Sequence, residues 1–178
     1  MRIISGKYKG RKMLGHDIEG TRPTMDRVRE SLFAMIQDYL KESIILDLFA
    51  GSGTLGIEAL SNGAKFCYFN DKNKKCTSVI NNNLDNLKEM NAEVLNKDYK
   101  EILKHFVKGN IKFNIIFLDP PYSEKIINEI IEYIIDNRLL LEDGIIIAEV
   151  NSDYIATEKI KIYKQRKFSD KEIIIFKK

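Results

Sequence analysis

The chain has 178 residues, 44% of them hydrophobic and 31% charged, which suits one globular domain with a sizeable core and room for a small appendage. No run approaches the roughly 20 apolar residues of a membrane span, and the N-terminus lacks the apolar core of a signal peptide. The two cysteines form no Cys-x-x-Cys pair and the two histidines are too few for a usual zinc site, so we expect a cytoplasmic protein without a metal.

The net charge of +3 is unevenly distributed along the chain. Residues 1–29 carry eight lysine or arginine residues and three acidic ones, so this segment has a charge of +5 and the other 149 residues sum to −2. A basic arm on a nearly neutral body indicates a polyanionic partner, and a merely solvated surface is the alternative.

The first elements differ from the rest of the chain. Residues 1–14 contain the turn residues Gly6 and Gly10 and fit a short hairpin. Thr24 can cap a helix that extends to about Leu40 and has apolar residues at helical spacing along one face, namely Val28, Leu32, Ile36 and Tyr39.

From residue 44 onward, apolar runs alternate with helical patterns. We expect strands at residues 44–49, 65–70, 92–96, 113–118 and 144–150, with helices at residues 54–62, 73–90, 99–107 and 125–137. Residues 159–168 and 172–178 predict a closing hairpin. The pattern predicts an α/β fold with a doubly wound, mostly parallel sheet, an antiparallel C-terminal hairpin and a small N-terminal basic hairpin. We expect an arm at residues 1–22 and one main domain at residues 23–178.

Residues suited to ligand binding follow four consecutive predicted strands. Ligands of such sheets bind at the carboxyl ends of the strands, near the point where the strand order reverses. A GxGxxG spacing follows the first strand, and Asp71 lies 20 positions beyond Gly51, where a carboxylate can accept the hydroxyls of a ribose. Asp98 follows the third strand, and the fourth ends in Asp119, Pro120, Pro121 and Tyr122.

The glycine pattern alone also fits a dinucleotide-binding dehydrogenase. Two features argue against that interpretation. Asp47 lies four residues before Gly51, where a carboxylate would repel a pyrophosphate but could pair with an ammonium group. A dehydrogenase also has no evident use for the tetrapeptide 119–122, although its prolines could simply end a strand and start a helix.

Four segments together carry a resemblance to a known family. They are "ISGKYKGRKM", "GTRPTMDRVRESLF", "LDLFAGSGTLGIEALSNGA" and "FLDPPY", and the similarity extends from the first residues to about Glu149. They resemble the RsmD family of bacterial 16S ribosomal RNA guanine-N2 methyltransferases, which belong to the class I S-adenosylmethionine-dependent enzymes with a Rossmann-like fold. Two departures are the aspartate at position 71, where the family more often has glutamate, and a tail that lacks the usual glycine before its acid.

The resemblance implies a cofactor site for S-adenosylmethionine, with S-adenosylhomocysteine as product. Its methionine end would lie at Asp47 and the backbone of Gly51 and Gly53, and its ribose at Asp71. The other implied positions are Asp98 for the adenine amine, Tyr99 beside it, and Phe49 as a pocket or core residue. Arg22 and Thr24 have two interpretations each: both could approach the methionine carboxylate, or Thr24 could cap the helix while Arg22 contacts RNA.

The resemblance also implies a role for the tetrapeptide. The Asp119 carboxylate and the Pro120 carbonyl would accept hydrogen bonds from an exocyclic amine and favour its tetrahedral form as positive charge develops. The two prolines, Pro120 and Pro121, would keep these acceptors rigid, and Tyr122 would stack on a base that has left its helix or loop. The chemistry needs no metal.

The implied partner is ribosomal RNA, either naked or within an assembled small-subunit particle. Basic residues of the arm and of the first helix would contact phosphates: Lys7, Lys9, Arg11, Lys12, Arg22, Arg27 and Arg29. Two alternatives stay open, an adenine-N6 methyltransferase acting on DNA or RNA and a catalytically silent RNA-binding module.

Overall fold

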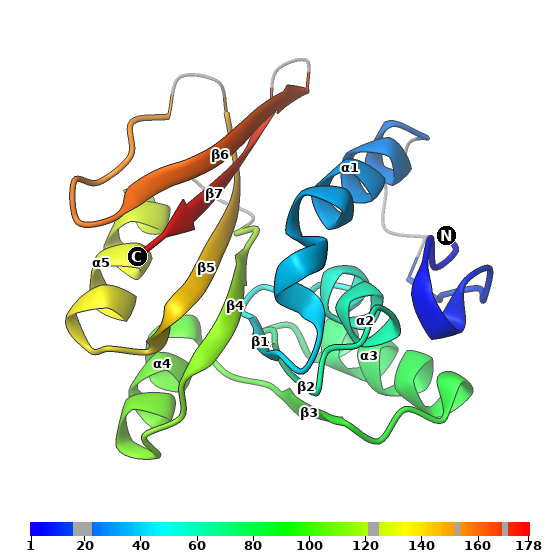
Figure 1. Cartoon of the computed structure of the whole chain (residues 1–178). Coiled ribbons are helices and arrows are strands. Elements are labelled where there is room, and N and C mark those ends of the chain that lie inside the picture. The colour runs from blue at the N-terminus through cyan, green and yellow to red at the C-terminus, as the bar shows by residue number, and fades with distance from the viewer. Residues whose placement is uncertain (16–22, 121–124, 152–153, 169–170) are drawn as a thin grey trace.

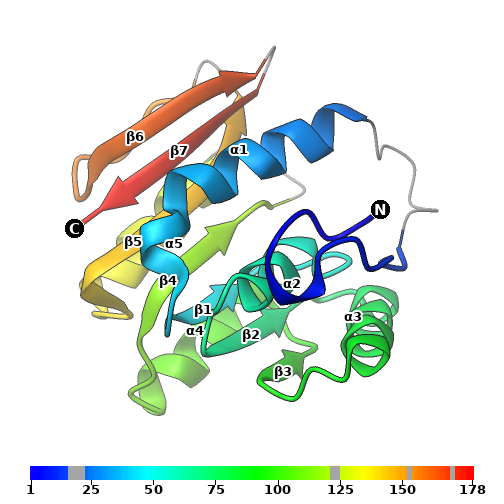
Figure 2. The ribbon, with the colours of Figure 1, turned by 45° about the vertical axis from the view of Figure 1, so that its right-hand side comes forward.

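The computed structural model describes residues 1–15, 23–120, 125–151, 154–168 and 171–178. It contains a seven-stranded sheet with helices packed on both of its faces (Figures 1 and 2). The strands are β1 (Ile44–Asp47), β2 (Phe66–Asn70), β3 (Ala92–Leu95), β4 (Phe113–Leu118), β5 (Leu140–Asn151), β6 (Lys161–Phe168) and β7 (Lys171–Lys177). The helices are α1 (Pro23–Leu40), α2 (Thr54–Ser61), α3 (Lys74–Leu87), α4 (Tyr99–Lys108) and α5 (Lys125–Asp136), with a short 3₁₀ helix at Gly6–Tyr8.

The strand order is β3-β2-β1-β4-β5-β7-β6. Strands β1 to β5 are parallel, whereas β7 pairs antiparallel with β5 and β6 antiparallel with β7. The order reverses between β1 and β4, which is the place where a doubly wound sheet binds its ligands. The predicted doubly wound, mostly parallel sheet with a C-terminal antiparallel hairpin is therefore confirmed.

Neighbouring strands alternate their side chains between two apolar layers. Ile45 pairs in register with Ile115, and both belong to the layer under α1, α2 and α3. Leu46 pairs with Ile116, and both lie in the opposite layer with α4 and α5. Because both faces of the sheet are covered, successive residues of each central strand are buried and the strands read as continuous apolar runs.

Several element boundaries differ from the prediction, and three of these differences have a clear local reason. β1 ends at Asp47 and not at residue 49, because the chain leaves the sheet to form the glycine-rich turn. α3 ends at Leu87 and not at residue 90, since Lys88 adopts a left-handed conformation with φ of 56°. β5 begins at Leu140, four residues early, because Leu140 pairs with Phe113 across an irregularity in the register.

Residues 1–15, called the N-terminal segment below, pack onto the main sheet domain. A single antiparallel bridge joins Arg2 to Lys12. The side chains of Ile3 and Met13 are 2% and 4% exposed and belong to the apolar layer of α1, α2 and α3. The segment is therefore held by the same core as the sheet, while the predicted boundary at residue 22 lies outside the described residues. None of the described helices is long and apolar enough to cross a membrane.

Candidate active site

The centre of the site is the carboxyl end of β1. Asp47 is the last residue of this strand, is 3% exposed, and accepts a hydrogen bond from the backbone N–H of Gly56 at 3.0 Å. Burial, together with the smaller effect of the nearby Asp119 and Asp71 charges, raises its pKa to about 7, although the hydrogen bond from Gly56 acts in the opposite direction. The residues that follow β1, β2 and β4 are thus close enough to interact electrostatically, as their places at one sheet edge predict.

The turn after β1 has the conformation that its glycines permit. Gly51 and Gly53 have φ of 53° and 80°, in the left-handed region that other residues rarely adopt. A Cβ atom at Gly51 would meet no atom within 4 Å, so this backbone is open to the approach of a ligand. Gly56 serves packing, because a Cβ atom there would lie 2.2 Å from the ring of Phe69 on β2.

Asp71 connects the end of β2 to this turn. One carboxylate oxygen accepts the N–H of Gly51 at 2.9 Å and the other accepts the N–H of Asn73 at 2.8 Å. The carboxylate is half-buried, so part of it faces solvent beside the turn. Asp71 therefore orders the glycine-rich turn in addition to any contact with a ligand.

The residues after β3 form the next part of the same edge. Asp98 is exposed and caps α4 by accepting the N–H of Lys100 at 2.9 Å. The ring of Tyr99 packs on that of Phe49, with 5.7 Å between their centres, and both residues are half-buried. The two rings form an apolar wall between the loops that follow β1 and β3.

Asp119 directly follows β4, next to Asp47 across the switch point. Its side chain is exposed to solvent. The protein atoms around the carboxyl group partly desolvate it and raise its pKa to about 6, and the Glu149 carboxylate is a second cause. Lys171 lowers the same pKa, which places the start of β7 near this carboxylate. Pro120 is half-buried, whereas Pro121 and Tyr122 lie outside the described residues.

The predicted RNA-contact residues divide into two groups. Lys9, Lys12 and Arg27 are exposed, and the side chains of the first two make no hydrogen bond or ion pair with the part of the chain that the structure describes. By contrast, Lys7 lies 2.7 Å from the buried Glu89 carboxylate, and Arg11 donates to the backbone oxygen of Asn86 at 2.8 Å. Both of these therefore help to attach the N-terminal segment to the end of α3. Arg22 and the side chain of Thr24 are outside the described residues.

The structure contradicts the predicted RNA contact of Arg29. We expected it to contact RNA, but its side chain is 5% exposed and lies 3.6 Å from the Glu58 carboxylate, which is 1% exposed. Its guanidinium also donates to the backbone oxygen of Arg2 at 2.8 Å. A guanidinium that is buried between α1, α2 and the N-terminal segment cannot reach a phosphate, so we remove Arg29 from the predicted contacts.

Sequence reasoning missed two buried polar residues that support the site. Glu58 accepts the backbone N–H groups of Ile4 and Ser5, at 3.0 and 2.8 Å. Asn83 donates to the backbone oxygen of Ser52 at 3.2 Å and accepts the N–H of Leu14 at 2.7 Å, so it joins the glycine-rich turn to the N-terminal segment. The only signal in the sequence is the position of these polar residues within otherwise amphipathic helices, because their partners are remote along the chain.

Comparison with known proteins identifies the family. Residues 1–177 match the family model described as Conserved hypothetical protein 95. The chain belongs to the RsmD family. It is 43% identical over 150 residues to YlbH of Bacillus subtilis, provisionally named an rRNA methyltransferase, covering 84% of this chain and 82% of the relative. It is 38% identical over 155 residues to Ribosomal RNA small subunit methyltransferase D of Haemophilus influenzae, covering 86% and 80%.

The structural comparison agrees with this assignment. The yhhF structure from Escherichia coli superposes with a TM-score of 0.86 and 30% identity over 99% of this chain and 96% of that one. That protein is provisionally named a methyltransferase. This RsmD family member is therefore a methyltransferase with a class I, Rossmann-like fold, as the four sequence segments predicted.

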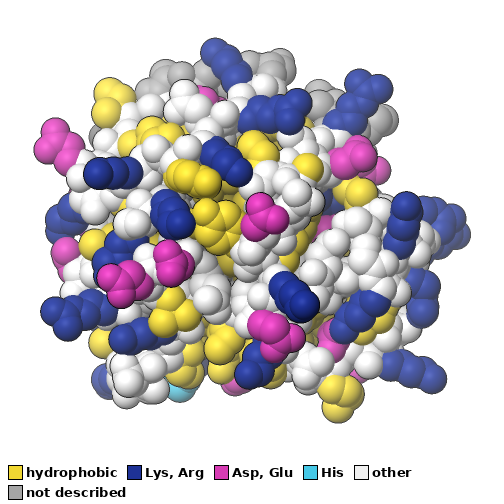
Figure 3. Space-filling view, viewed as in Figure 1, with side chains coloured by type: hydrophobic (Ala, Val, Ile, Leu, Met, Phe, Trp, Pro, Cys, Tyr) yellow, Lys and Arg dark blue, Asp and Glu magenta, His cyan; other side chains and the backbone are white. Residues whose placement is uncertain are grey.

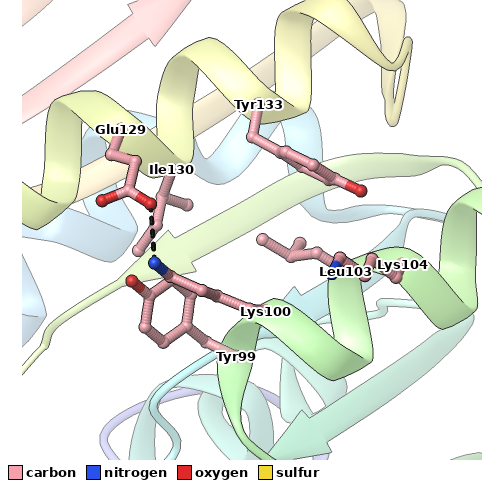
Figure 4. Close-up of a pocket in the computed structure, with 7 residues that line it drawn as sticks. All are labelled: Tyr99, Lys100, Leu103, Lys104, Glu129, Ile130 and Tyr133. Atoms are coloured by element: carbon pink, nitrogen blue, oxygen red, sulfur yellow. Dashed lines mark ion pairs between the residues drawn. The ribbon is translucent and has the colours of Figure 1, made fainter.

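A small cavity lies next to the site but not at its centre. It has a volume of about 160 Å³ between α4 and α5, and Figure 4 shows its lining residues, which are Tyr99, Lys100, Leu103, Lys104, Glu129, Ile130 and Tyr133. An ion pair of 3.0 Å between Lys100 and Glu129 joins the two helices. Because the acidic residues of this RsmD protein converge at the ends of β1, β2 and β4, that edge of the sheet is the candidate active site. Among the described residues, no group of three or more histidine, cysteine or acidic side chains could hold a metal ion.

Proposed function

We propose that this protein transfers a methyl group from S-adenosylmethionine to the exocyclic N2 amine of a guanine in small-subunit ribosomal RNA. The observation that carries the proposal is the convergence of Asp47, Asp71 and Asp119 at the switch point of the sheet, where burial and, to a smaller extent, the charges of the other two raise the pKa of Asp47. The names of the relatives from Haemophilus influenzae and Escherichia coli, both Ribosomal RNA small subunit methyltransferase D, support the substrate.

The residues at the strand ends fit S-adenosylmethionine. Asp47 is a buried carboxylate that no lysine or arginine of the described residues neutralises, and the ammonium of the donor would supply the missing cation. Gly51 leaves room for its methionine part, Gly53 would add its backbone from the same turn, and Asp71 suits its ribose hydroxyls. Asp98, Tyr99 and Phe49 would hold the adenine. When bound, the donor supplies an activated methyl group on its sulfonium.

The end of β4 suits an exocyclic amine acceptor. Such an amine is a poor nucleophile, because its lone pair is delocalised into the aromatic ring. The carboxylate of Asp119 and the carbonyl of Pro120 would accept the two amine protons and hold the nitrogen towards the methyl group. Pro121 would keep these acceptors rigid, and Tyr122 would stack on the extruded base.

The exposed basic residues of the N-terminal segment and of α1 would contact the phosphates of the RNA. Lys9, Lys12 and Arg27 are exposed on the half of the molecule that carries α1, α2 and α3. We propose a cytoplasmic protein, because its substrate would be the ribosomal RNA there, either naked or in an assembled small-subunit particle. The adenine-N6 alternative uses the same surface but modifies a different nucleoside, and the silent-binder alternative uses it without modifying any nucleoside.

Mass spectrometry of nucleosides tests the proposal. Small-subunit ribosomal RNA and assembled particles from cells lacking the gene are incubated with purified protein and isotopically labelled donor. We expect labelled N2-methylguanosine. Labelled N6-methyladenosine would support the adenine alternative, and RNA binding without any labelled nucleoside would indicate a silent module.

The affinity for the donor should depend on pH through Asp47. The folded pKa of about 7 lies above the ordinary value of 3.8, so the carboxyl group is protonated at pH 5 and ionised at pH 8. Since an ionised carboxylate pairs with the ammonium, we expect the binding of S-adenosylhomocysteine to strengthen from pH 6 to pH 8. Calorimetric titrations across this range measure the effect.

The Asp47→Asn variant is the control for this pH dependence. It keeps the size of the side chain and removes its titration. We expect weak binding in this variant that changes little between pH 6 and pH 8. An equally steep pH dependence in the variant and in the wild type would exclude Asp47 as the titrating group.

Replacing Lys9 and Lys12 together with alanine should weaken RNA binding through lost phosphate contacts. Each contact contributes about 0.7 to 0.9 to the slope of log affinity against log salt, so the slope should fall by about 1.5. Lys7 and Arg11 are left intact, because they attach the N-terminal segment to α3. Filter binding of a 16S ribosomal RNA transcript at several salt concentrations measures the slope.

The matched control is a second pair of exposed lysines. Lys41 and Lys65 lie next to the starting ends of β1 and β2, at the edge of the sheet away from the site. Their joint replacement with alanine removes the same charge and should leave the slope unchanged. Equal slopes in the wild type and in both double variants would mean that Lys9 and Lys12 face solvent and do not contact the RNA.

A further inference from the structure

A second concentration of positive charge lies in residues 159–178, which form the C-terminal hairpin of β6 and β7. These 20 residues contain eight lysine or arginine residues and two acidic ones. Residues 30–158 contain 13 basic and 21 acidic residues, so the chain has basic segments at both ends and an acidic body between them. A polyanion is therefore attracted to the two ends and repelled by much of the remaining surface.

Strand β6 presents its charge to solvent. It is the edge strand of the sheet, all of its residues are exposed or half-buried, and it contains four basic residues and no acidic one. Figure 3 shows lysine and arginine side chains interleaved with hydrophobic ones over the region of β6 and β7. Arg166, Lys167 and Lys161 form no ion pair with any acid of the described residues, in contrast to Lys159, which pairs with Asp136 at 2.6 Å.

The pairing register places one end of β6 at the same end of the sheet as the candidate active site, called the catalytic end below. Lys171 pairs with Asn151 at the carboxyl end of β5 and with Phe168 at the end of β6. Arg166 and Lys167 immediately precede Phe168, so they lie at the same edge as Asp119, whose pKa responds to Glu149 and Lys171. The N-terminal segment contacts α2 and α3, which pack on the β1–β3 half of the sheet, whereas β6 is its opposite edge (Figures 1 and 2).

The chemistry at this end of β6 suits RNA. The guanidinium of Arg166 lies 5.5 Å from the centre of the half-buried Phe168 ring, which provides a cation beside an aromatic face. Arginine planes and aromatic rings stack on unpaired bases, and lysine and arginine pair with phosphates. An enzyme that acts on an extruded base needs contacts with the nucleotides on both sides of it.

We propose that Arg166, Lys167 and Phe168 form a second RNA-binding surface, which holds the ribosomal RNA on the side of the active site opposite the N-terminal segment. This inference rests on the proposed function. It adds a contact between the RNA and the C-terminal hairpin to the contact proposed for the N-terminal segment. The competing explanation is that charges on an edge strand only prevent pairing with another chain. That explanation requires charge anywhere along β6, whereas RNA binding requires it at the catalytic end.

The test compares two double variants of the full chain that remove equal charge. Arg166→Gln with Lys167→Gln alters the catalytic end of β6. Lys161→Gln with Lys178→Gln alters the opposite end, where Lys161 pairs in register with Lys177. A 16S ribosomal RNA transcript is the probe, and binding at several salt concentrations and steady-state methylation are measured.

For the catalytic-end variant we expect a salt slope lower by about 1.5 and a KM for RNA raised several-fold, with an unchanged kcat at saturating RNA. Its affinity for S-adenosylhomocysteine should equal that of the wild type. The opposite-end variant should keep the wild-type slope and KM. This split separates a binding role from a folding defect, which would lower kcat and the cofactor affinity as well.

Equal slopes and KM values in the catalytic-end variant and the wild type would overturn the inference. Self-association of both variants with unchanged RNA affinity would also overturn it, in favour of edge protection. A wild-type protein that neither binds nor methylates ribosomal RNA would overturn the proposed function as well, so the two failures are distinguishable.

Discussion

Replacing Asp119 with alanine should lower the rate of methyl transfer by about a hundredfold or more, as expected for the loss of a preorganised group that stabilises developing charge. Asp119 lies next to Asp47 across the switch point but is separate from the proposed donor contacts, so the affinity for S-adenosylhomocysteine should stay near that of the wild type. Single-turnover methylation of ribosomal RNA and calorimetry of donor binding measure the two quantities.

The pH dependence of the same reaction gives an independent check. With a pKa of about 6, Asp119 is protonated at pH 5 and accepts hydrogen bonds as a carboxylate at pH 7 and above. The single-turnover rate should therefore rise between pH 5 and pH 7 in the wild type, at saturating donor. Asp119→Asn keeps the size of the side chain but should lose this rise. Wild-type rates in Asp119→Ala would show that the end of β4 does not hold the reacting amine.

Replacing Glu58 with alanine should lower the free energy of unfolding by about 3–5 kcal/mol, the usual cost of breaking a buried ion pair. The variant leaves the buried Arg29 guanidinium with only the exposed Asp26 carboxylate at 3.1 Å, and it removes the acceptor of the N–H groups of Ile4 and Ser5. Urea denaturation measures the change. Glu30→Ala, which removes an exposed acid from α1, should change stability by no more than about 0.5 kcal/mol.

The part of the chain that Glu58→Ala destabilises is as informative as the change in unfolding free energy. The N-terminal segment depends on Glu58, so limited proteolysis should cleave it faster in Glu58→Ala under conditions where the rest of the chain stays folded. An unfolding free energy within about 0.5 kcal/mol of the wild type would show that the Arg29–Glu58 pair contributes little net stability.

The sequence alone determined the elements and the order of the residues at the strand ends. Phe113–Leu118 is a strand in both the prediction and the structure, because a strand buried on both faces is apolar at nearly every position, with Asn114 the one polar residue here. Asp47, Asp71 and Asp119 follow apolar runs directly, and parallel strands bring their carboxyl ends to one edge. Local pattern and general sheet geometry were therefore enough to place most of the candidate site.

Only the tertiary structure decided which charges are available to a partner. Arg29 and Lys9 look alike in a basic segment, yet one is buried against Glu58 and the other is exposed. Asn83 binds the turn at Ser52 and the segment at Leu14, neither of which is its neighbour along the chain. The charge of β6 lies at the same end of the sheet as Asp119 only because β6 pairs with β7 and β7 with β5. A sequence pattern reports the period of burial within one element, whereas the partner of a polar group depends on which elements pack together.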